Sequence, residues 1–269
     1  MHGFPDDAHT WDETAEALTR AGYRTIAPFV RGFAPTKLHA GVARTGEIAA
    51  LARDMLELAD ALQIERFHYI GHDWGARAGY TLAGLQPERL LSLTALAVAY
   101  GTNVAGQELE AEQLRAYWYQ WYFATPRGER ALRDNRRAFC RDLWRMWSPS
   151  WIIDDARYAA TADAFDNPDF VEVVLHSYRQ RWGFAPGDPT YAADRAVLEA
   201  VPPIAVDTLV LMGAEDGATL PASANGTKHY FKGRYDVRVI ARSGHFIARE
   251  RPGNVVAALL PHLSSAGRR

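Results

Sequence analysis

The sequence predicts an α/β domain with a mostly parallel sheet, flanked by helices and interrupted by a helical insertion. Short apolar segments alternate with amphipathic segments before residue 101 and after residue 189, which is the pattern of strands joined by crossover helices. Residues 101–189 show helical periodicity without strands and hold six of the eight tryptophans. A chain of 269 residues is long enough for one large domain with such a lid. We therefore expect a core of residues 1–100 and 190–269 and a cap of residues 101–189.

The individual elements follow from hydrophobic periodicity. Apolar residues at every third or fourth position predict helices, and short apolar runs between glycines and polar residues predict strands. The predicted helices are 11–20, 47–62, 76–85 and 252–263. The predicted strands are 23–29, 67–70, 90–98, 208–213 and 235–241.

Composition limits the classes of partner. The formal net charge of −2 gives no electrostatic reason to expect a nucleic acid or an anionic membrane. Cys140 is the only cysteine, so no intrachain disulfide is possible, and no apolar run approaches the ~20 residues of a membrane helix. The residues after Met1 lack the basic start and apolar core of a secretory signal. We expect a cytoplasmic protein without a metal or cofactor.

The strongest functional motif is Gly-His-Asp-Trp-Gly at residues 71–75, between a predicted strand and a predicted helix. A small residue two positions before and two positions after Asp73 permits a very tight turn, which lifts the central side chain above the sheet. A helix N-terminus favours an anion, so Asp73 should stay ionised. We interpret Asp73 as a nucleophile, and the alternative is that it only caps the following helix.

Two further motifs follow predicted strands near the end of the chain. His245 comes after the last strand, and the segment Gly-Ala-Glu-Asp-Gly at 213–217 comes directly after strand 208–213. Active sites of open α/β sheets lie at the carboxyl ends of strands. A carboxylate there would orient His245 and stabilise its imidazolium form. Asp216 is preferred for this role, with Glu215 as its competitor.

The order nucleophile, acid, histidine resembles that of the α/β-hydrolase family. The segment His-Gly-Phe-Pro at residues 2–5 resembles the family's oxyanion-hole segment, and Arg-Gly-Phe at 31–33 resembles the loop after the next strand. The likeness runs over essentially the whole chain. Within the family, an aspartate at the elbow indicates epoxide hydrolases and haloalkane dehalogenases. The resemblance implies that the backbone N–H groups of Phe4 and Trp74 form the oxyanion hole.

An aspartate nucleophile implies a two-step reaction. A carboxylate needs no deprotonation and can displace at a saturated carbon, which forms an alkyl-enzyme ester on Asp73. His245 is then free to activate a water for attack on the carboxyl carbon of that ester. The expected substrates are a small apolar electrophile and water.

The cap indicates the kind of electrophile. Opening an epoxide leaves an alkoxide that needs a proton donor, and epoxide hydrolases supply two lid tyrosines for it. The segments Tyr-Gln-Trp-Tyr-Phe at 119–123 and Ser-Tyr-Arg at 177–179 resemble the segments that carry these tyrosines. The resemblance implies Tyr119 and Tyr178 as donors, with Tyr117 and Tyr122 as rivals to Tyr119. The substrate pocket is expected to include His2, Trp121 and Phe246.

Two other functions remain open. Trp74 could bind a halide through its indole N–H, as in haloalkane or haloacid dehalogenases. However, haloalkane dehalogenases usually carry Asn where this chain has Phe4, and haloacetate dehalogenases usually carry Arg in place of Trp74. The remaining alternative is an inactive or binding-only hydrolase scaffold, although no catalytic position is visibly lost.

The chain departs from the family at its start. Family members normally carry two strands and most of a third before the His-Gly-x-Pro segment, and the third lies between the strands expected at 23–29 and 67–70. Without it, the backbone groups of both neighbours lack partners unless these two strands close the gap. We therefore expect a chain that starts at Met1 to be less stable and less active than one with an upstream extension, which thermal unfolding of both would test.

Overall fold

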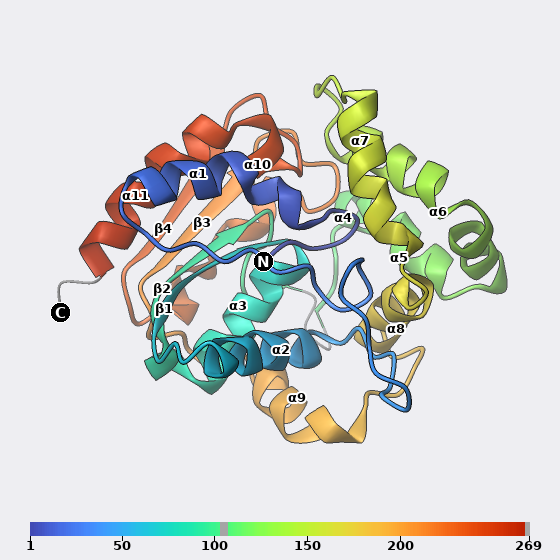
Figure 1. Ribbon diagram of the computed structural model, residues 1–269, viewed down its shortest axis with the longest axis horizontal. Helices are drawn as coiled ribbons and strands as arrows, with labels where there is room; N and C mark the ends of the chain where they lie inside the picture. Colours follow the sequence, from blue (N-terminus) through green and yellow to red (C-terminus); the bar gives the residue numbers. More distant parts are fainter. Residues whose placement is uncertain (103–106, 267–269) are drawn as a thin grey trace.

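The computed structural model describes residues 1–102 and 107–266, and its centre is a parallel sheet (Figure 1). The strands lie in the order β1 (Phe67–His72), β2 (Leu90–Leu96), β3 (Thr208–Gly213) and β4 (Tyr235–Ile240). Each neighbouring pair is parallel. β2 and β3 are almost completely buried, because a parallel sheet is covered on both faces.

Helices cover the two faces of the sheet. On one face α1 (Asp12–Arg20) lies beside α11 (Pro252–Ala266), and on the other α2 (Ile48–Ala61) lies beside α3 (Trp74–Leu85) (Figure 1). These four confirm the predicted helices, and α3 starts earlier than expected because the helix follows the tight turn at Asp73 directly. The remaining helices of the core are α9 (Ala192–Glu199), α10 (Ile247–Glu250) and short 3-10 segments at Ala8–Trp11, Pro87–Arg89, Pro189–Tyr191, Pro221–Ala224 and Thr227–Tyr230.

The segment between β2 and β3 forms a helical cap beside the sheet (Figure 1). Over the described residues 107–189 it contains helices and no strand. Its limits at 101 and 189 stay a prediction, and residues 103–106 and 267–269 lie outside the described residues. None of the described helices is long and apolar enough to cross a membrane. The cap helices are α4 (Ala111–Ala116), α5 (Trp118–Phe123), α6 (Pro126–Trp147), α7 (Asp155–Ala162), a 3-10 segment at Asp163–Asp166, and α8 (Phe170–Arg181).

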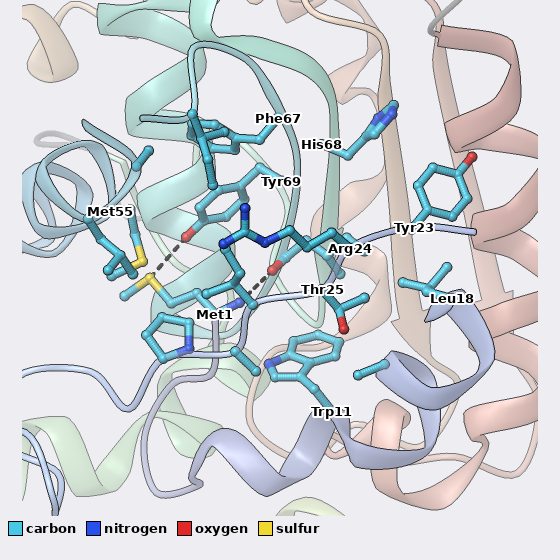
Figure 2. Close-up of a pocket in the computed structure, with 18 of the residues that line it drawn as sticks. Met1, Trp11, Leu18, Tyr23, Arg24, Thr25, Met55, Phe67, His68 and Tyr69 are labelled. Atoms are coloured by element: carbon cyan, nitrogen blue, oxygen red, sulfur yellow. Dashed lines mark hydrogen bonds between the residues drawn. The ribbon is translucent and has the colours of Figure 1, made fainter. Parts of the chain in front are cut away.

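The predicted strand at 23–29 is wrong, because these residues have no regular secondary structure. Arg24, Thr25 and Tyr69 of β1 line a groove of about 370 Å³. Figure 2 shows these side chains around it, with segment 23–29 on one side and β1 on the other. β1 is an edge of the sheet, and Met1 is bonded to it through its amino group and the carbonyl oxygen of Ile70, at 2.6 Å. A strand requires a hydrogen-bonded neighbour, and among the described residues segment 23–29 reaches none. Segment 23–29 therefore does not pair with β1.

Candidate active site

Asp73 occupies a sharp turn between β1 and α3. Its backbone has φ 51° and ψ −112°, a conformation that costs a residue other than glycine about 1–3 kcal/mol. The Asp73 N–H donates to the carbonyl of Leu96 on β2 at 3.2 Å, which fixes the turn to the neighbouring strand. The Asp73 side chain makes no capping hydrogen bond to α3. The simple helix-cap interpretation is therefore wrong, and the carboxylate is free for another purpose.

Two glycines make this turn possible. A Cβ atom on Gly71 would lie 2.3 Å from the backbone carbonyl group of Gly75, and a Cβ atom on Gly3 would lie 2.4 Å from Oδ1 of Asp73. Neither space can hold a methyl group without movement of the backbone or of the carboxylate. The sequence motif and the segment at residues 2–5 therefore depend on each other sterically.

Replacing Gly71 with alanine is expected to lower the free energy of unfolding by about 2–3 kcal/mol, because the new methyl group overlaps rigid backbone. Gly253→Ala is the matched control, since nothing lies within 4 Å of the position a Cβ would take there. Urea unfolding of both variants measures the difference. Equal unfolding midpoints for the two variants would show that the turn can relax.

His245 lies between two carboxylates in the loop after β4. Its Nδ1 is 2.9 Å from Oδ2 of Asp216, and its Nε2 is 3.8 Å from Oδ2 of Asp73. The first distance is a hydrogen bond and the second is too long for one. Nε2 is buried and has no hydrogen-bond partner among the described residues. It therefore faces the carboxylate of Asp73 with an unused site for a proton.

The structure places Asp216, rather than Glu215, against His245. Both Asp216 oxygens are used: Oδ2 bonds the imidazole, and Oδ1 accepts from the backbone N–H groups of Ala218 and Thr219 at 2.7 and 2.9 Å. These bonds fix the orientation of the carboxylate toward the imidazole. The preference for Asp216 thus has a geometric basis in the turn that follows β3.

The two carboxylates determine the proton affinity of His245. Burial by itself lowers the pKa of an imidazole, but the charge and hydrogen bond of Asp216, with the charge of Asp73, outweigh it. The net effect raises the pKa of His245 above its ordinary value. The two carboxylates therefore stabilise the imidazolium that forms when His245 accepts a proton as a general base.

The N-terminal segment supplies a donor to Asp73. The backbone N–H of Phe4 donates to Oδ1 of Asp73 at 2.9 Å. A Cβ atom on Gly3 would come within 2.5 Å of the backbone nitrogen of Trp74, so the segment at residues 2–5 lies directly against the start of α3. Phe4 and Trp74, the two residues predicted to form the oxyanion hole, thus lie together beside Asp73. Because Oδ1 of Asp73 is bound by the N–H of Phe4, Oδ2 is the other, outward carboxylate oxygen.

Tyr119 and Tyr178 meet each other near Asp73, whose charge acts on both phenols. Their rings are 5.3 Å apart and nearly perpendicular, and the Tyr178 hydroxyl accepts a hydrogen bond from the indole N–H of Trp74 at 3.2 Å. Burial raises the pKa of both phenols above their ordinary value, and the nearby charge of Asp73 raises it further. Both hydroxyls therefore keep their protons at neutral pH.

The rivals of Tyr119 face elsewhere. Tyr122 stacks on Phe139 with the ring centroids 6.3 Å apart, and Tyr117 packs against Trp182. Tyr117 precedes α5 and is itself buried, and the helical phase of α5 turns Tyr119 rather than Tyr122 into the core. Tyr119 contacts the ring of Phe4.

Two residues assigned to the substrate pocket from the sequence are placed differently. His2 uses both ring nitrogens on the backbone, with Nδ1 at 3.1 Å from the Gly3 carbonyl and Nε2 accepting from the Val30 N–H. Burial lowers the pKa of His2 to about 4, so it is a neutral structural residue. Trp121 lies two positions along α5 from Tyr119 and therefore points away from the core, against Trp182 at 4.4 Å.

Phe246 and one residue that the sequence did not indicate, Trp147, surround His245. Phe246 is fully buried and packs on Trp144 at 4.7 Å. Trp147 ends α6, and its ring is 5.0 Å from that of His245 and 4.8 Å from that of Tyr119. Its carbonyl accepts from the His245 N–H at 3.0 Å. Its position could not be read from the sequence, because it depends on how the cap folds back on the loop after β4.

The geometry matches that of a known family. The sequence profile of the α/β-hydrolase fold matches residues 1–252. A crystal structure of a candidate epoxide hydrolase from Klebsiella pneumoniae superimposes with a TM-score of 0.92 at 37% identity, covering 98% of this chain and 88% of that one. Epoxide hydrolase A of Mycobacterium tuberculosis is 27% identical in an alignment 288 positions long, which covers 98% of this chain and 88% of the relative. Fluoroacetate dehalogenase from Burkholderia is 31% identical over 187 residues, which cover 68% of this chain and 56% of the relative.

The fold and the sequence match together define the class: this chain belongs to the α/β-hydrolase family. Within that family it is an epoxide hydrolase-like enzyme, as its similarity to the Klebsiella structure shows. The predicted fold class and enzyme class are thereby confirmed. No group of three or more side chains suited to a metal ion occurs in residues 1–102 and 107–266.

Proposed function

We propose that this hydrolase opens epoxides to vicinal diols, with Asp73 as nucleophile and His245 as general base. The observation that carries the proposal is the pair of protonated tyrosine hydroxyls beside Asp73, because an epoxide needs a proton donor for its oxygen. The similarity to epoxide hydrolases supports the same substrate class. We further propose that the enzyme acts in the cytoplasm on small molecules.

In the first step, Oδ2 of Asp73 attacks one epoxide carbon, since Oδ1 is held by the N–H of Phe4. A carbon–oxygen bond forms to Asp73 as the ring carbon–oxygen bond breaks. The electron pair of the broken bond stays on the epoxide oxygen, which takes a proton from Tyr178 or Tyr119. The product is a hydroxyalkyl ester of Asp73.

In the second step, a water between His245 and Asp73 gives a proton to Nε2, and its oxygen attacks the carboxyl carbon of the ester. The 3.8 Å separation and the unpartnered Nε2 support a water at this place. The N–H groups of Phe4 and Trp74 stabilise the oxyanion. The ester bond then breaks, and the alkoxide that leaves takes the proton from His245 to complete the diol. The second proton of the water, which is left on the carboxyl group of Asp73, passes to the tyrosinate and restores both groups.

Removing a phenol hydroxyl should impair the first step. We expect Tyr178→Phe to lower kcat for a terminal epoxide by about 10- to 100-fold and the double variant with Tyr119→Phe by about 10²- to 10⁴-fold, the usual range for general acids. Tyr122→Phe is the matched control on the same cap, because that ring stacks on Phe139 away from the site. Diol formation is the measurement, and full activity of the double variant would remove the proton-donor role.

The pH dependence tests the general base. His245 must be neutral to accept a proton, so kcat limited by ester hydrolysis should rise as pH increases through the raised pKa of His245. Asp216→Asn removes the charge that raises this pKa and leaves burial, which lowers it. The rising limb of the kcat profile is therefore expected to move to lower pH in this variant, with kcat reduced. A limb that stays in place would assign it to another group.

Carbon–halogen hydrolysis is the second candidate. The indole N–H of Trp147 is buried without an acceptor in the described part of the chain, and such a donor can solvate a departing halide. The similarity to the Burkholderia fluoroacetate dehalogenase also favours it. The nucleophile and base would be the same, and release of halide in place of diol formation distinguishes the two reactions.

A further inference from the structure

Arg181, at the end of cap helix α8, packs its cation against Tyr178 of the site and has no counter-ion among the described residues. Its Cζ atom lies 5.0 Å from the centre of the Tyr178 ring. Although part of the side chain is exposed, Nη2 is buried and has no hydrogen-bond partner among the described residues. Arg179, two residues earlier, shows the contrast, because its Nη2 donates to Glu129 at 2.9 Å. Arg181 forms no ion pair with a described acidic residue.

A second arginine comes from the core. Arg77 lies one turn of α3 after Asp73, and its Nη1 donates to the carbonyl of Thr102 at 3.3 Å. Its Nε is buried and also has no acceptor in the part of the chain that the structure describes. The two unused donors therefore belong to different parts of the fold, one to the cap and one to the core.

The burial and charge of Arg181 favour a bound anion beside it. Burial lowers the pKa of Arg181, and repulsion by Arg77 lowers it further. A desolvated cation is costly unless an opposite charge pairs with it. Asp73 does not pair with either arginine, since its oxygens face the Phe4 N–H and His245.

We propose that Arg181 and Arg77 form an anion subsite that binds the carboxylate of an epoxy acid. This inference rests on the proposed epoxide hydrolysis and names its substrate class. Each guanidinium has one unused N–H nitrogen, and the two nitrogens would bind the two oxygens of one carboxylate. Planar guanidinium groups bind carboxylates well. Because Arg181 lies over the Tyr178 ring and the hydroxyl of that ring would meet the epoxide oxygen, the carboxylate and the epoxide would lie close together in one small substrate. Binding the anion would also join the cap to the core.

The test compares 3-phenylglycidate with its neutral amide, 3-phenylglycidamide. The unmutated enzyme should prefer the acid, and Arg181→Met should lower the ratio of kcat/KM for acid over amide by about 10- to 100-fold, the effect of losing a charged hydrogen bond. Arg181→Lys should restore part of the ratio, and Arg77→Met should lower it as well. Arg145→Met is the control, because Arg145 is an exposed residue paired with Asp142. An acid-to-amide ratio that is the same in the unmutated enzyme and in Arg181→Met would overturn the proposal.

A binding measurement separates this inference from the proposed reaction. Isothermal titration with 3-phenylpropionate and with 3-phenylpropanamide requires no turnover. Tighter binding of the carboxylate, lost in Arg181→Met, supports the subsite even if no epoxide is opened. If the epoxide amide is hydrolysed but neither carboxylate is preferred, the subsite is refuted while epoxide hydrolysis stands. In that case the arginines only balance the charge of Asp73.

Discussion

His245→Gln is expected to stop the enzyme after the first chemical step, with the substrate covalently bound to Asp73. Glutamine cannot accept the proton of the water next to the ester, so the loss of general-base catalysis lowers turnover by about 10²- to 10⁴-fold. Attack by Asp73 does not need His245, and the ester therefore accumulates. Intact-protein mass spectrometry should show an increase equal to the mass of the whole epoxide.

The same experiment identifies the electrophile. An epoxide adds its full mass, whereas an alkyl halide adds only its carbon skeleton and releases halide. His9→Gln serves as the control, because His9 is exposed and paired with Asp12 away from the site. Peptide mapping must then locate the added mass at Asp73. An adduct on another residue, or none with any epoxide or halide, would contradict the covalent mechanism.

Asp73→Ala should have the largest effect on turnover. It removes the nucleophile itself, and we expect kcat for diol formation to fall by about 10⁴-fold or more, as for other nucleophile deletions. The strained turn should tolerate the small side chain, because alanine fills less space than aspartate. Diol formation measured over hours gives the residual rate, and the variant should form no ester in the mass experiment.

Two comparisons make the Asp73 result specific. Asp236→Ala removes an exposed carboxylate of β4 that pairs with Arg238, and its activity should match that of the unmutated enzyme. Combining Asp73→Ala with His245→Gln should cost little more than Asp73→Ala alone, because the two residues act in one sequence of steps. Additive losses would indicate that they act independently, and substantial turnover by Asp73→Ala would require a different nucleophile.

The residue pattern was sufficient to predict the local structure of the site. The glycines at positions 71 and 75 indicate a tight turn at Asp73, and a Cβ atom indeed does not fit at Gly71. The amphipathic period of residues 47–62 predicts α2 because a helix buries one face, whatever packs against it. The order of strand, turn and helix likewise follows from local propensity. These features depend on neighbours in the sequence.

The errors and omissions all concern contacts between distant segments. Segment 23–29 has the composition of a strand, but a strand exists only when another strand lies beside it, and a groove lies there instead. His2 and Trp121 were assigned to the pocket by type, whereas their partners Val30 and Trp182 decide where they point.

The fold class, the turn that carries Asp73 and the position of His245 after the last strand could be predicted without coordinates. Tight turns and amphipathic helices depend on the spacing of residues that are close in the sequence. The packing of the folded chain shows that Asp216 rather than Glu215 bonds His245 and that Tyr119 rather than its rivals meets Tyr178. It also shows that Arg77 and Arg181 each keep a buried nitrogen without a hydrogen-bond partner among the described residues. Neighbouring side chains in a turn or a helix point in different directions. Which of them reaches the site is therefore set by the packing of the cap on the sheet.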